Sequence, residues 1–312
     1  MNSQNLAQVG YENYYQMLSD TIRMDAYREA IFKHVKQGDT VVDLGCGTGL
    51  LSIWAIKAGA KKVYAIEKTD AINLAKEIAF ANGCHEQIEF IQESSLKAQL
   101  PEKVDVLVSE TLGSFGIDEN TLAFTRDARD RFLKHGGVMI PERIALYIAP
   151  VEDKSVYHKL DFWRQIPEVN FTPAFDLFSS KIMIEAVNPS GILAEASKIG
   201  DIDLYGDIDP TFLARVYMQI NKPGTIHGVA GWFTVTLCKG IEISTAPTAP
   251  KTHWKQAFMP IKDAIDVIKN DVLDWTVCVR EKEPGSDDTQ ILYEYRCTQL
   301  INEVELLKQT KQ

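Results

Sequence analysis

The fold of this chain is decided by residues 41–49, VVDLGCGTG, in which an apolar run passes directly into three closely spaced glycines. The apolar run predicts a buried strand. Gly45, Gly47 and Gly49 predict a sharp turn after it, because glycine lacks Cβ, tolerates positive φ and lets a ligand approach the main chain. Residues 50–58 are mostly apolar and predict the helix that follows. Strand, glycine turn and helix together indicate a nucleotide-type site.

The spacing of the glycines separates two kinds of nucleotide site. A dinucleotide-binding turn, G-x-G-x-x-G, would place its third glycine where this chain has Leu50. A second apolar run at residues 62–66 ends on Glu67, whose carboxylate could accept both hydroxyls of a ribose. A ribose site without a pyrophosphate site favours S-adenosylmethionine over NAD. The weaker alternative is that the glycines only terminate a strand and that Glu67 is a solvated side chain.

The composition limits the partners and the compartment. The chain has 312 residues, with 43 acidic and 33 basic side chains, a net charge of −10 and a pI of about 5.2. An acidic protein is a poor match for phosphate-rich surfaces, so we expect no nucleic acid partner and favour cationic ones. The five cysteines form no C-x-x-C pair, which argues against a disulfide framework and against a metal site. We therefore expect the protein to reside in a reducing compartment.

The chain lacks the patterns of a secreted or membrane protein. Residues 1–15 are polar, without the basic and apolar regions of a signal peptide, and no run of about 18 apolar residues occurs. We therefore expect no membrane partner and a cytoplasmic location.

Apolar runs and helical patterns alternate through residues 1–141, which is typical of a parallel sheet covered by helices. A Gly136-Gly137 pair follows the last helix, residues 138–140 resume a strand, and Pro141 marks a turn. We expect a domain boundary there. The strands are expected at residues 40–44, 62–66, 88–91 and 104–109, and the helices at 50–58, 69–82 and 121–134.

The second half, residues 142–312, follows a different pattern. An insert at residues 155–180 is rich in aromatic residues without strand alternation, as in segments that dock on another surface. Around it, the β-type stretches predict an antiparallel sandwich or barrel. These stretches are residues 143–149, 212–220, 226–238, 273–280 and 289–298.

A second candidate for chemistry follows the strand at residues 104–109. Glu110 and Glu119 stand at the two ends of a loop that contains Gly113 and Gly116. Such a loop lies at the carboxyl edge of an open α/β sheet, so the two carboxylates could converge on a substrate if the loop folds back. Two glutamates at this spacing are more often surface residues, and the spacing alone leaves both interpretations open.

Several motifs in a fixed order make the chain resemble the protein arginine methyltransferase family. The resemblance spans about residues 14–300 and implies a class I S-adenosylmethionine-dependent methyltransferase. The implied fold is α/β, with a Rossmann-like domain followed by an antiparallel β-barrel domain, in which residues 155–180 take the place of a dimerisation arm. A homodimer is therefore implied. The motifs are the glycine turn, Glu67, the loop from Glu110 to Glu119, the segment Thr252-His253-Trp254-Lys255-Gln256, the residues Met17, Leu18, Asp20 and Arg23, and the junction Pro141-Glu142-Arg143.

The resemblance also implies how S-adenosylmethionine is held as the cofactor. Glu67 would bind its ribose and Arg23 would pair with its methionyl carboxylate, while Ser94 and Ser95 fall where the adenine-contacting strand end is expected. The implied cofactor-binding set is Arg23, Asp43, Gly45, Gly47, Gly49, Glu67, Ser94 and Ser95.

The implied catalytic residues are Glu110 and Glu119, which clamp a guanidinium, and a His253–Asp20 pair that accepts a proton. A guanidinium stays charged at pH 7 because its pKa is above about 12, and the methyl donor is itself a sulfonium cation. Two carboxylates offset that repulsion and orient the attacking nitrogen. The implied walls of the substrate pocket are Met17, Thr111, Ser114 and Trp254.

Two positions depart from the family pattern. Thr111 and Ser114 stand where typical members have aromatic residues, so the entrance is wider and the acceptor can be arginine in a protein or peptide, or free arginine. Methylation of another small guanidine or amine metabolite is the alternative enzyme function. A non-catalytic cofactor-binding subunit is less favoured because both glutamates and His253 are present. Within the family, the chain resembles a divergent, bacterial-type member.

Overall fold

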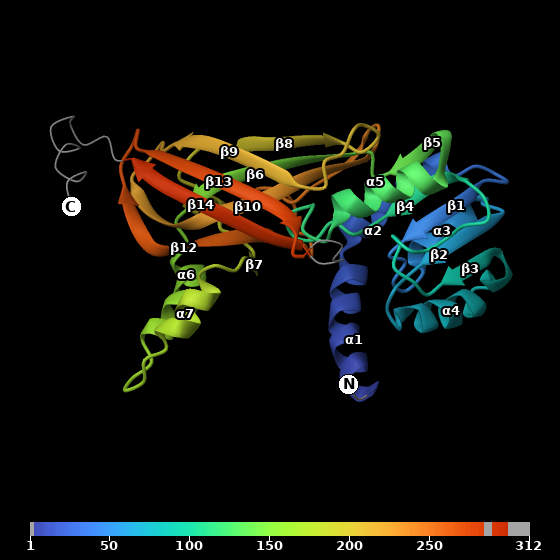
Figure 1. The fold of residues 1–312 in the computed structure, drawn as a ribbon, viewed down its shortest axis with the longest axis horizontal. Helices are drawn as coiled ribbons and strands as arrows, with labels where there is room; N and C mark the ends of the chain where they lie inside the picture. Colours follow the sequence, from blue (N-terminus) through green and yellow to red (C-terminus); the bar gives the residue numbers. More distant parts are fainter. Residues whose placement is uncertain (1–2, 284–288, 299–312) are drawn as a thin grey trace.

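The structure is a computed structural model in which residues 3–283 and 289–298 are described. Figure 1 shows a parallel sheet flanked by helices, on the right, beside a larger unit of antiparallel strands on the left. Two helices, α1 (Ser3–Ser19) and α2 (Thr21–His34), precede the first sheet. The predicted α/β class is confirmed. None of the described helices is long and apolar enough to cross a membrane.

Five parallel strands form the first sheet, in the order β3-β2-β1-β4-β5. All five residues of β1 are buried, and three of them, Val41, Val42 and Leu44, are apolar, as expected of a central parallel strand. Because β1 lies between β2 and β4, the carboxyl ends of these three strands meet at one edge of the sheet. The predicted alternation of strands and helices is confirmed. The strands are β1 (Thr40–Leu44), β2 (Lys62–Ile66), β3 (Ile88–Ile91), β4 (Val104–Ser109) and β5 (Leu133–Ile140), and the helices between them are α3 (Leu50–Ala58), α4 (Ala71–Ala81) and α5 (Thr121–Phe132).

The predicted break at Gly136-Gly137 is wrong, because both glycines lie inside β5. The pairing of β4 with β5 shifts register between Val104 and Val106, where Leu133 and Val138 are the successive partners. Gly136 has φ 74°, which L side chains rarely adopt. The glycines therefore form a bulge within the strand, and helix α5 ends earlier than expected, at Phe132.

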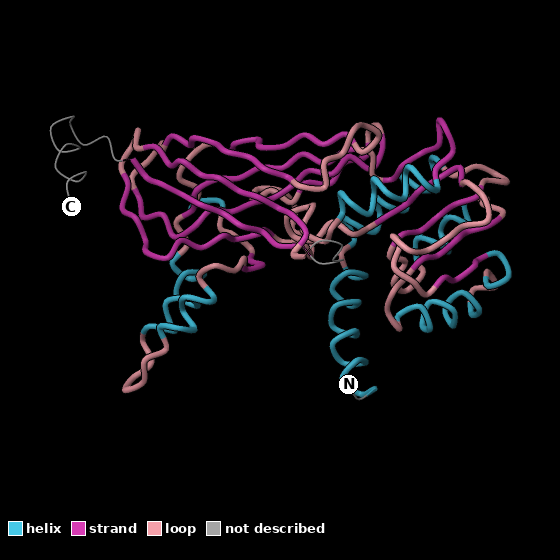
Figure 2. The backbone as a smooth tube through the Cα atoms, in the orientation of Figure 1, coloured by secondary structure: helices cyan, strands magenta, loops and turns pink. Residues whose placement is uncertain are grey.

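The antiparallel part contains two sheets, drawn in magenta in Figure 2. One has the order β7-β12-β10-β6-β8 with β11 paired to β10, and the other has the order β14-β13-β9. A single hydrophobic core runs from Leu44 in β1 through Phe233 to Trp275 in β13. The strands are β6 (Arg143–Val151), β7 (Met183–Glu185), β8 (Ser197–Asp203), β9 (Phe212–Gln219), β10 (Gly224–Cys238), β11 (Ile241–Ser244), β12 (Gln256–Val267), β13 (Val272–Glu281) and β14 (Thr289–Thr298).

Several strands of this part were not predicted. β12 contains Pro260, a residue that cannot donate to the ladder, and Pro260 pairs with Gly228 where the β10–β12 register shifts. β8 has the sequence SKIGDID, with few residues that favour strands. The chain leaves the first sheet at Ile140 and enters the second at Arg143, and we retain residue 141 as a proposed domain boundary.

The aromatic insert projects from the antiparallel part as a helical hairpin, visible as α6 and α7 in Figure 1. It contains α6 (Lys154–Asp161) and α7 (Thr172–Phe178). The ring of Trp163 lies between those of Phe162, Phe171 and Phe178, with centroids 5.6, 6.1 and 5.0 Å away. Arg164 ties the hairpin to β12, donating to Asp263 Oδ1 at 2.8 Å.

Candidate active site

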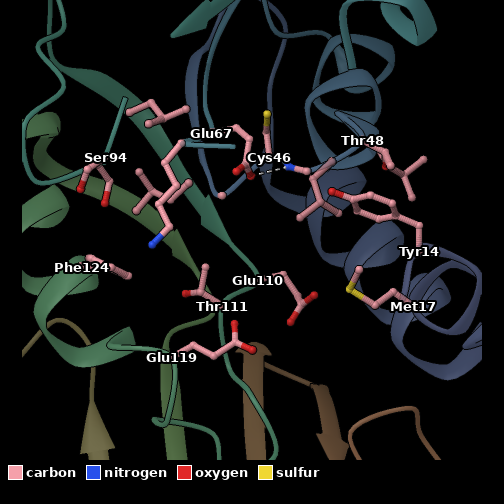
Figure 3. A pocket seen from close by; sticks show the side chains of 18 of the residues that line it. Tyr14, Met17, Cys46, Thr48, Glu67, Ser94, Glu110, Thr111, Glu119 and Phe124 are labelled. Atoms are coloured by element: carbon pink, nitrogen blue, oxygen red, sulfur yellow. Dashed lines mark hydrogen bonds between the residues drawn. The ribbon is translucent and has the colours of Figure 1, made fainter. Parts of the chain in front are cut away.

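A cavity of about 580 Å³ lies at the carboxyl edge of β1, β2 and β4. In Figure 3, Tyr14 and Met17 of α1 lie on the right and Ser94 on the left, with Glu67 above and Glu110 and Glu119 below. This edge is where open α/β sheets bind their ligands. The predicted site residues that line it are Met17, Arg23, Gly45, Gly47, Glu67, Ser94, Ser95, Glu110, Thr111 and Glu119.

The glycine turn exposes backbone to this cavity. Gly45 has φ 68° and Gly47 has φ 51°, so both positions require the left-handed region. A Cβ on Gly47 would lie 3.6 Å from Cε1 of Tyr14, which shows that the tyrosine ring covers the turn. The main chain at Gly45 and Gly47 is therefore directly accessible to a ligand held beneath Tyr14.

The Glu67 carboxylate is fixed by two backbone donors. Its Oε2 accepts from the N–H of Gly47 at 3.2 Å, and its Oε1 accepts from the N–H of Thr69 at 2.8 Å. Each carboxylate oxygen has two lone pairs, so both remain able to accept from a ligand hydroxyl. The sequence at the end of β2 thus places an oriented, two-oxygen acceptor beside the glycine turn.

Two members of the predicted cofactor set lie behind the cavity and not on it. Asp43 is fully buried under the turn, and its Oδ2 accepts from Ser52 Oγ at 2.6 Å. Burial raises the pKa of Asp43 to about 7, against the lowering effect of the Ser52 hydrogen bond. A Cβ on Gly49 would lie 3.2 Å from that of Ala75, so Gly49 faces α4. Both residues support the turn from beneath.

Arg23 and Glu110 form an ion pair inside the cavity wall. The Nη1 atom of Arg23 donates to Glu110 Oε2, and its Nη2 donates to the backbone oxygen of Met17 at 3.0 Å. Burial raises the pKa of Glu110, opposed by the charges of Arg23 and His253. Arg23 therefore helps to keep the Glu110 carboxylate ionised.

Asp20 and His253 meet across the two parts of the chain. Asp20 Oδ2 lies 2.9 Å from His253 Nδ1 and accepts from the backbone N–H of His253 at 2.8 Å. Its Oδ1 caps α2 by accepting from the N–H of Arg23 at 3.1 Å. Burial would raise the pKa of Asp20, but the hydrogen bonds from His253 and Arg23 outweigh it and the pKa is lowered. Asp20 is thus held as an anion against the histidine.

Glu119 projects into the cavity from the other end of the loop. Its pKa is raised to about 7, first by partial removal from water and then by the negative charges of Glu110 and Asp118, with Lys68 opposing them. The two predicted glutamates are therefore close enough to repel each other, so the structure favours the interpretation that the loop folds back. Such a pair is prepared to accept hydrogen bonds from a cation.

Two predicted pocket walls do not line the cavity. Ser114 is 3% exposed and its side chain turns inward to Asp118. Trp254 is 4% exposed, because its ring packs edge-on against Phe233 at 5.3 Å. Both residues pack behind the cavity wall. Of Thr111 and Ser114, the two residues that depart from the family pattern, Thr111 is the one that lines the cavity.

The sequence analysis missed several cavity residues. Tyr14 comes from α1, and its position over Gly47 depends on how that helix packs. Phe124 comes from α5, Lys282 directly follows β13, and Thr289 is the first residue of β14. Local sequence patterns could not place these residues on the cavity wall, because their positions depend on contacts between segments that are distant in the chain.

The geometry defines the class of protein. A parallel sheet, a glycine turn that exposes backbone, and an oriented carboxylate after the second strand are the site of a class I S-adenosylmethionine-dependent methyltransferase. A family model for the arginine methyltransferase oligomerization subdomain matches residues 142–299, and one for ribosomal protein L11 methyltransferase matches residues 25–140. The chain belongs to the protein arginine N-methyltransferase family.

Individual relatives agree with this assignment. Protein arginine N-methyltransferase 6 of Danio rerio is 33% identical over 300 residues, covering 90% of this chain and 85% of that protein. Protein arginine N-methyltransferase 1 of Saccharomyces cerevisiae is 30% identical over 292 residues, covering 90% of this chain and 84% of that protein. These relatives are eukaryotic and give no support to the bacterial-type assignment.

Solved structures show the same fold. Protein arginine methyltransferase 10 of Arabidopsis thaliana superimposes with a TM-score of 0.77 at 27% identity, covering 93% of each chain. An enzyme–prozyme heterotetrameric complex of Trypanosoma brucei with AdoHcy gives a TM-score of 0.83 at 23% identity, covering 94% of this chain and 95% of that chain.

Proposed function

We propose that this protein transfers the methyl group of S-adenosylmethionine to a guanidino nitrogen of arginine in proteins. The observation that carries the proposal is the pair of facing carboxylates, Glu110 and Glu119, in the cavity that also holds Glu67 (Figure 3). Membership of the arginine methyltransferase family supports it. A solved relative contains AdoHcy, the demethylated form of this cofactor.

The residues around the cavity fit the cofactor. The backbone of Gly45 and Gly47 is open toward it, and Glu67 offers two acceptor oxygens for ribose hydroxyls. Arg23 Nε has no hydrogen-bond partner among the described residues, so the guanidinium retains a donor for a methionyl carboxylate. Ser94 and Ser95 line the far side, where we propose the adenine lies. When bound, S-adenosylmethionine supplies an electrophilic methyl group on a sulfonium cation.

Glu110 and Glu119 are proposed to hold the acceptor. Carboxylates bind a guanidinium through charge-assisted hydrogen bonds, and two of them fix its plane and its position. Their combined charge offsets the repulsion between the guanidinium and the sulfonium, and orients one nitrogen for in-line attack. Proximity of this kind contributes much of the rate in a displacement between two bound groups.

Asp20 and His253 are proposed to receive the proton that the guanidino nitrogen loses. Asp20 accepts from Nδ1 of His253, which leaves Nε2 as the basic nitrogen of the imidazole. Asp20 also stabilises the imidazolium that forms when Nε2 takes the proton. The transfer balances, because the methylated nitrogen loses one proton and the arginine product keeps a single positive charge.

The decisive experiment is mass spectrometry of reactions that contain the purified protein, S-adenosylmethionine and one acceptor each. The acceptors are Arg-Gly-rich peptides, free arginine and simple guanidines. We expect peptides to gain one or two increments of a methyl group. Glu119→Gln should lose this activity, while Glu77→Gln on the exposed face of α4 should retain it.

Other outcomes of that experiment separate the alternatives. Methylation of free arginine with unchanged peptides would replace the protein substrate by a small molecule, and Thr111 would then be the first residue to vary. No methylation of any guanidine would overturn the proposed reaction. A Glu119→Gln variant of wild-type activity would overturn the proposed clamp.

The oligomer is proposed to be a homodimer formed through the hairpin of α6 and α7. Phe162, Leu177 and Phe178 expose large apolar surfaces on it, which favours burial against a second copy. The match of residues 142–299 to an oligomerization subdomain supports the formation of an oligomer. Analytical ultracentrifugation tests this dimer, and a monomer at micromolar concentration would contradict it.

A cytoplasmic location remains a prediction that rests on the cysteine usage.

A further inference from the structure

The carboxylate of Asp118 ties together the loop between the two glutamates. Its Oδ2 accepts from the N–H of Ser114 at 3.2 Å and from Ser114 Oγ at 3.1 Å. Its Oδ1 accepts from the N–H of Phe115 at 2.8 Å. One side chain thus satisfies three donors at the tip of the loop, and the residue after it is Glu119.

The loop is shaped to admit this carboxylate. Gly113 has φ 64°, and a Cβ there would lie 2.6 Å from Asp118 Cγ, so any other residue at this position would displace the carboxylate. The backbone oxygen of Asp118 accepts from Thr289 Oγ1, at the start of β14. Asp118 is therefore held at its side chain by its own loop and at its backbone by the last hairpin.

The same loop is anchored on the antiparallel sheet. Phe115, fully buried, packs on β10, and a Cβ on Gly231 would lie 2.5 Å from Phe115 Cε2. Gly116 lies against Phe233, where a Cβ would approach that ring to 2.9 Å. The loop therefore has a fixed tip, and the bonds to Asp118 connect that tip to Glu119.

We propose that Asp118 is a positioning residue for the acceptor site: its carboxylate holds the loop in the shape that places Glu119 opposite Glu110. This inference rests on the proposed role of the two glutamates. It goes beyond that role because Asp118, although it lines the cavity, has its carboxylate bound by Ser114 and Phe115 and so acts through its neighbour.

The charge of Asp118 gives this role a measurable consequence. Glu119 is faced by Glu110, Asp118 and Lys68, and Asp118 is one of the two carboxylates that raise its pKa. Removing the charge of Asp118 lowers the pKa of Glu119. The acid limb therefore reports whether Asp118 lies as an anion beside Glu119, and KM reports whether its hydrogen bonds position Glu119 for the acceptor.

The test compares Asp118→Asn with Ser114→Ala in the full-length protein. Asparagine keeps the size of aspartate but loses the charge, and its NH2 group replaces one of the two oxygens that accept from Ser114 and Phe115. Ser114→Ala removes one of the three hydrogen bonds and no charge. Measured quantities are kcat and KM for an Arg-Gly peptide from pH 5.5 to 9, and the dissociation constant of S-adenosylhomocysteine by calorimetry.

For Asp118→Asn we expect KM for the peptide to rise about tenfold, as for the loss of a charge-assisted hydrogen bond. The acid limb of kcat/KM should move to lower pH, and cofactor affinity should change less than about twofold. For Ser114→Ala we expect a smaller rise in KM than for Asp118→Asn, and an acid limb of kcat/KM at the same pH as in the wild type. A wild-type KM, or a raised KM with an unmoved acid limb, would overturn the proposal for Asp118.

A second variant keeps the proposal testable if Asp118→Asn does not fold. Gly113→Ala displaces the same carboxylate without changing its charge, so it should raise KM and leave the acid limb near its wild-type position. A wild-type KM in this variant would also overturn the proposal. These outcomes differ from failure of the proposed function, in which the wild-type protein itself would methylate no arginine peptide.

Discussion

Arg23 and Glu110 form an ion pair whose side chains are only 9% and 11% exposed. The pair joins α2, whose N-cap is Asp20, to the loop that follows β4. The proposed cofactor side and the proposed acceptor side of the cavity therefore share one electrostatic contact. We therefore expect a change in one partner of this contact to alter the charge of the other.

Replacement of Arg23 by methionine tests that contact. Without the guanidinium, Glu110 loses the main charge that lowers its pKa, so the pKa of Glu110 should rise. Loss of a charge-assisted hydrogen bond should weaken S-adenosylhomocysteine about tenfold or more in calorimetry. Arg28→Met, on the exposed side of the same helix, is the matched control and should bind as the wild type does. Equal affinities in the two variants would exclude Arg23 from the cofactor site.

The pH dependence of kcat/KM should show an acid limb near pH 7. Glu119, with a pKa of about 7, accepts from a guanidinium only when ionised, so kcat/KM for a peptide should fall about tenfold from pH 7.5 to pH 6. The bound cation favours the ionised form, so the limb of kcat should lie at lower pH than that of kcat/KM. Rate profiles for the two constants check this, and coincident limbs would argue against Glu119 as the titrating group.

The stability of the ligand-free protein should respond to pH through the same carboxylate. The pKa of Glu119 is raised from 4.5 to about 7, so the folded state binds more protons than the unfolded state between these values. The free energy of unfolding should therefore fall as pH rises through this window. Thermal unfolding at pH 5 and pH 8 measures the change, and Glu119→Gln should reduce it. Asp43, whose pKa is also about 7, should supply part of what remains, together with Glu110 and Asp118, whose pKa values are raised by burial.

Asp20→Asn separates two roles of one side chain. Asparagine is as good a helix N-cap as aspartate, so α2 should keep its start. The backbone N–H of His253 loses its acceptor, Asp20 Oδ2, so the free energy of unfolding should fall by about 1–3 kcal/mol. The negative charge beside His253 is lost, and kcat should fall about a hundredfold if the pair accepts the proton. Chemical denaturation and steady-state kinetics measure the two effects. A normal kcat would leave His253 with a structural role only.

Trp163→Ala should weaken self-association. The ring of Trp163 organises Phe162, Phe171 and Phe178 at the end of the hairpin, and buried aromatic anchors of this kind contribute about 2 kcal/mol or more at interfaces. We expect the dimer dissociation constant to rise about thirtyfold in sedimentation. Leu213→Ala, an exposed apolar residue of β9, is the control. Equal sedimentation of the two variants would place the interface elsewhere.

The parallel sheet was predictable because its causes are local. β1, β2, β3 and β4 begin and end where their apolar runs do, and the turn at Gly45 and Gly47 is required by backbone geometry alone. Glu67 follows its strand directly, so its position at the sheet edge follows from that of β2. Each of these features depends on residues that are neighbours in the chain.

Features that depend on distant contacts were not predictable in the same way. Tyr14 covers Gly47 only because α1 packs across the turn, and β12 is recognisable only beside β10. Ser114 was expected on the pocket wall, but the nearby Asp118 draws it inward. Trp254 was expected there too, but Phe233 of another strand offers it a buried position. The resemblance located these motifs without indicating which way their side chains turn.

The close contact between Gly231 and Phe115 has a consequence for interpreting variants of this protein. Gly231 lies in the middle of β10, far along the chain from Glu110 and Glu119. It contributes no side chain to the core or to the cavity. One added methyl group would nevertheless press on the ring beneath the loop that carries Glu119. Gly231→Ala is chemically a mild core substitution, yet we expect its main effect to be weaker binding of the acceptor.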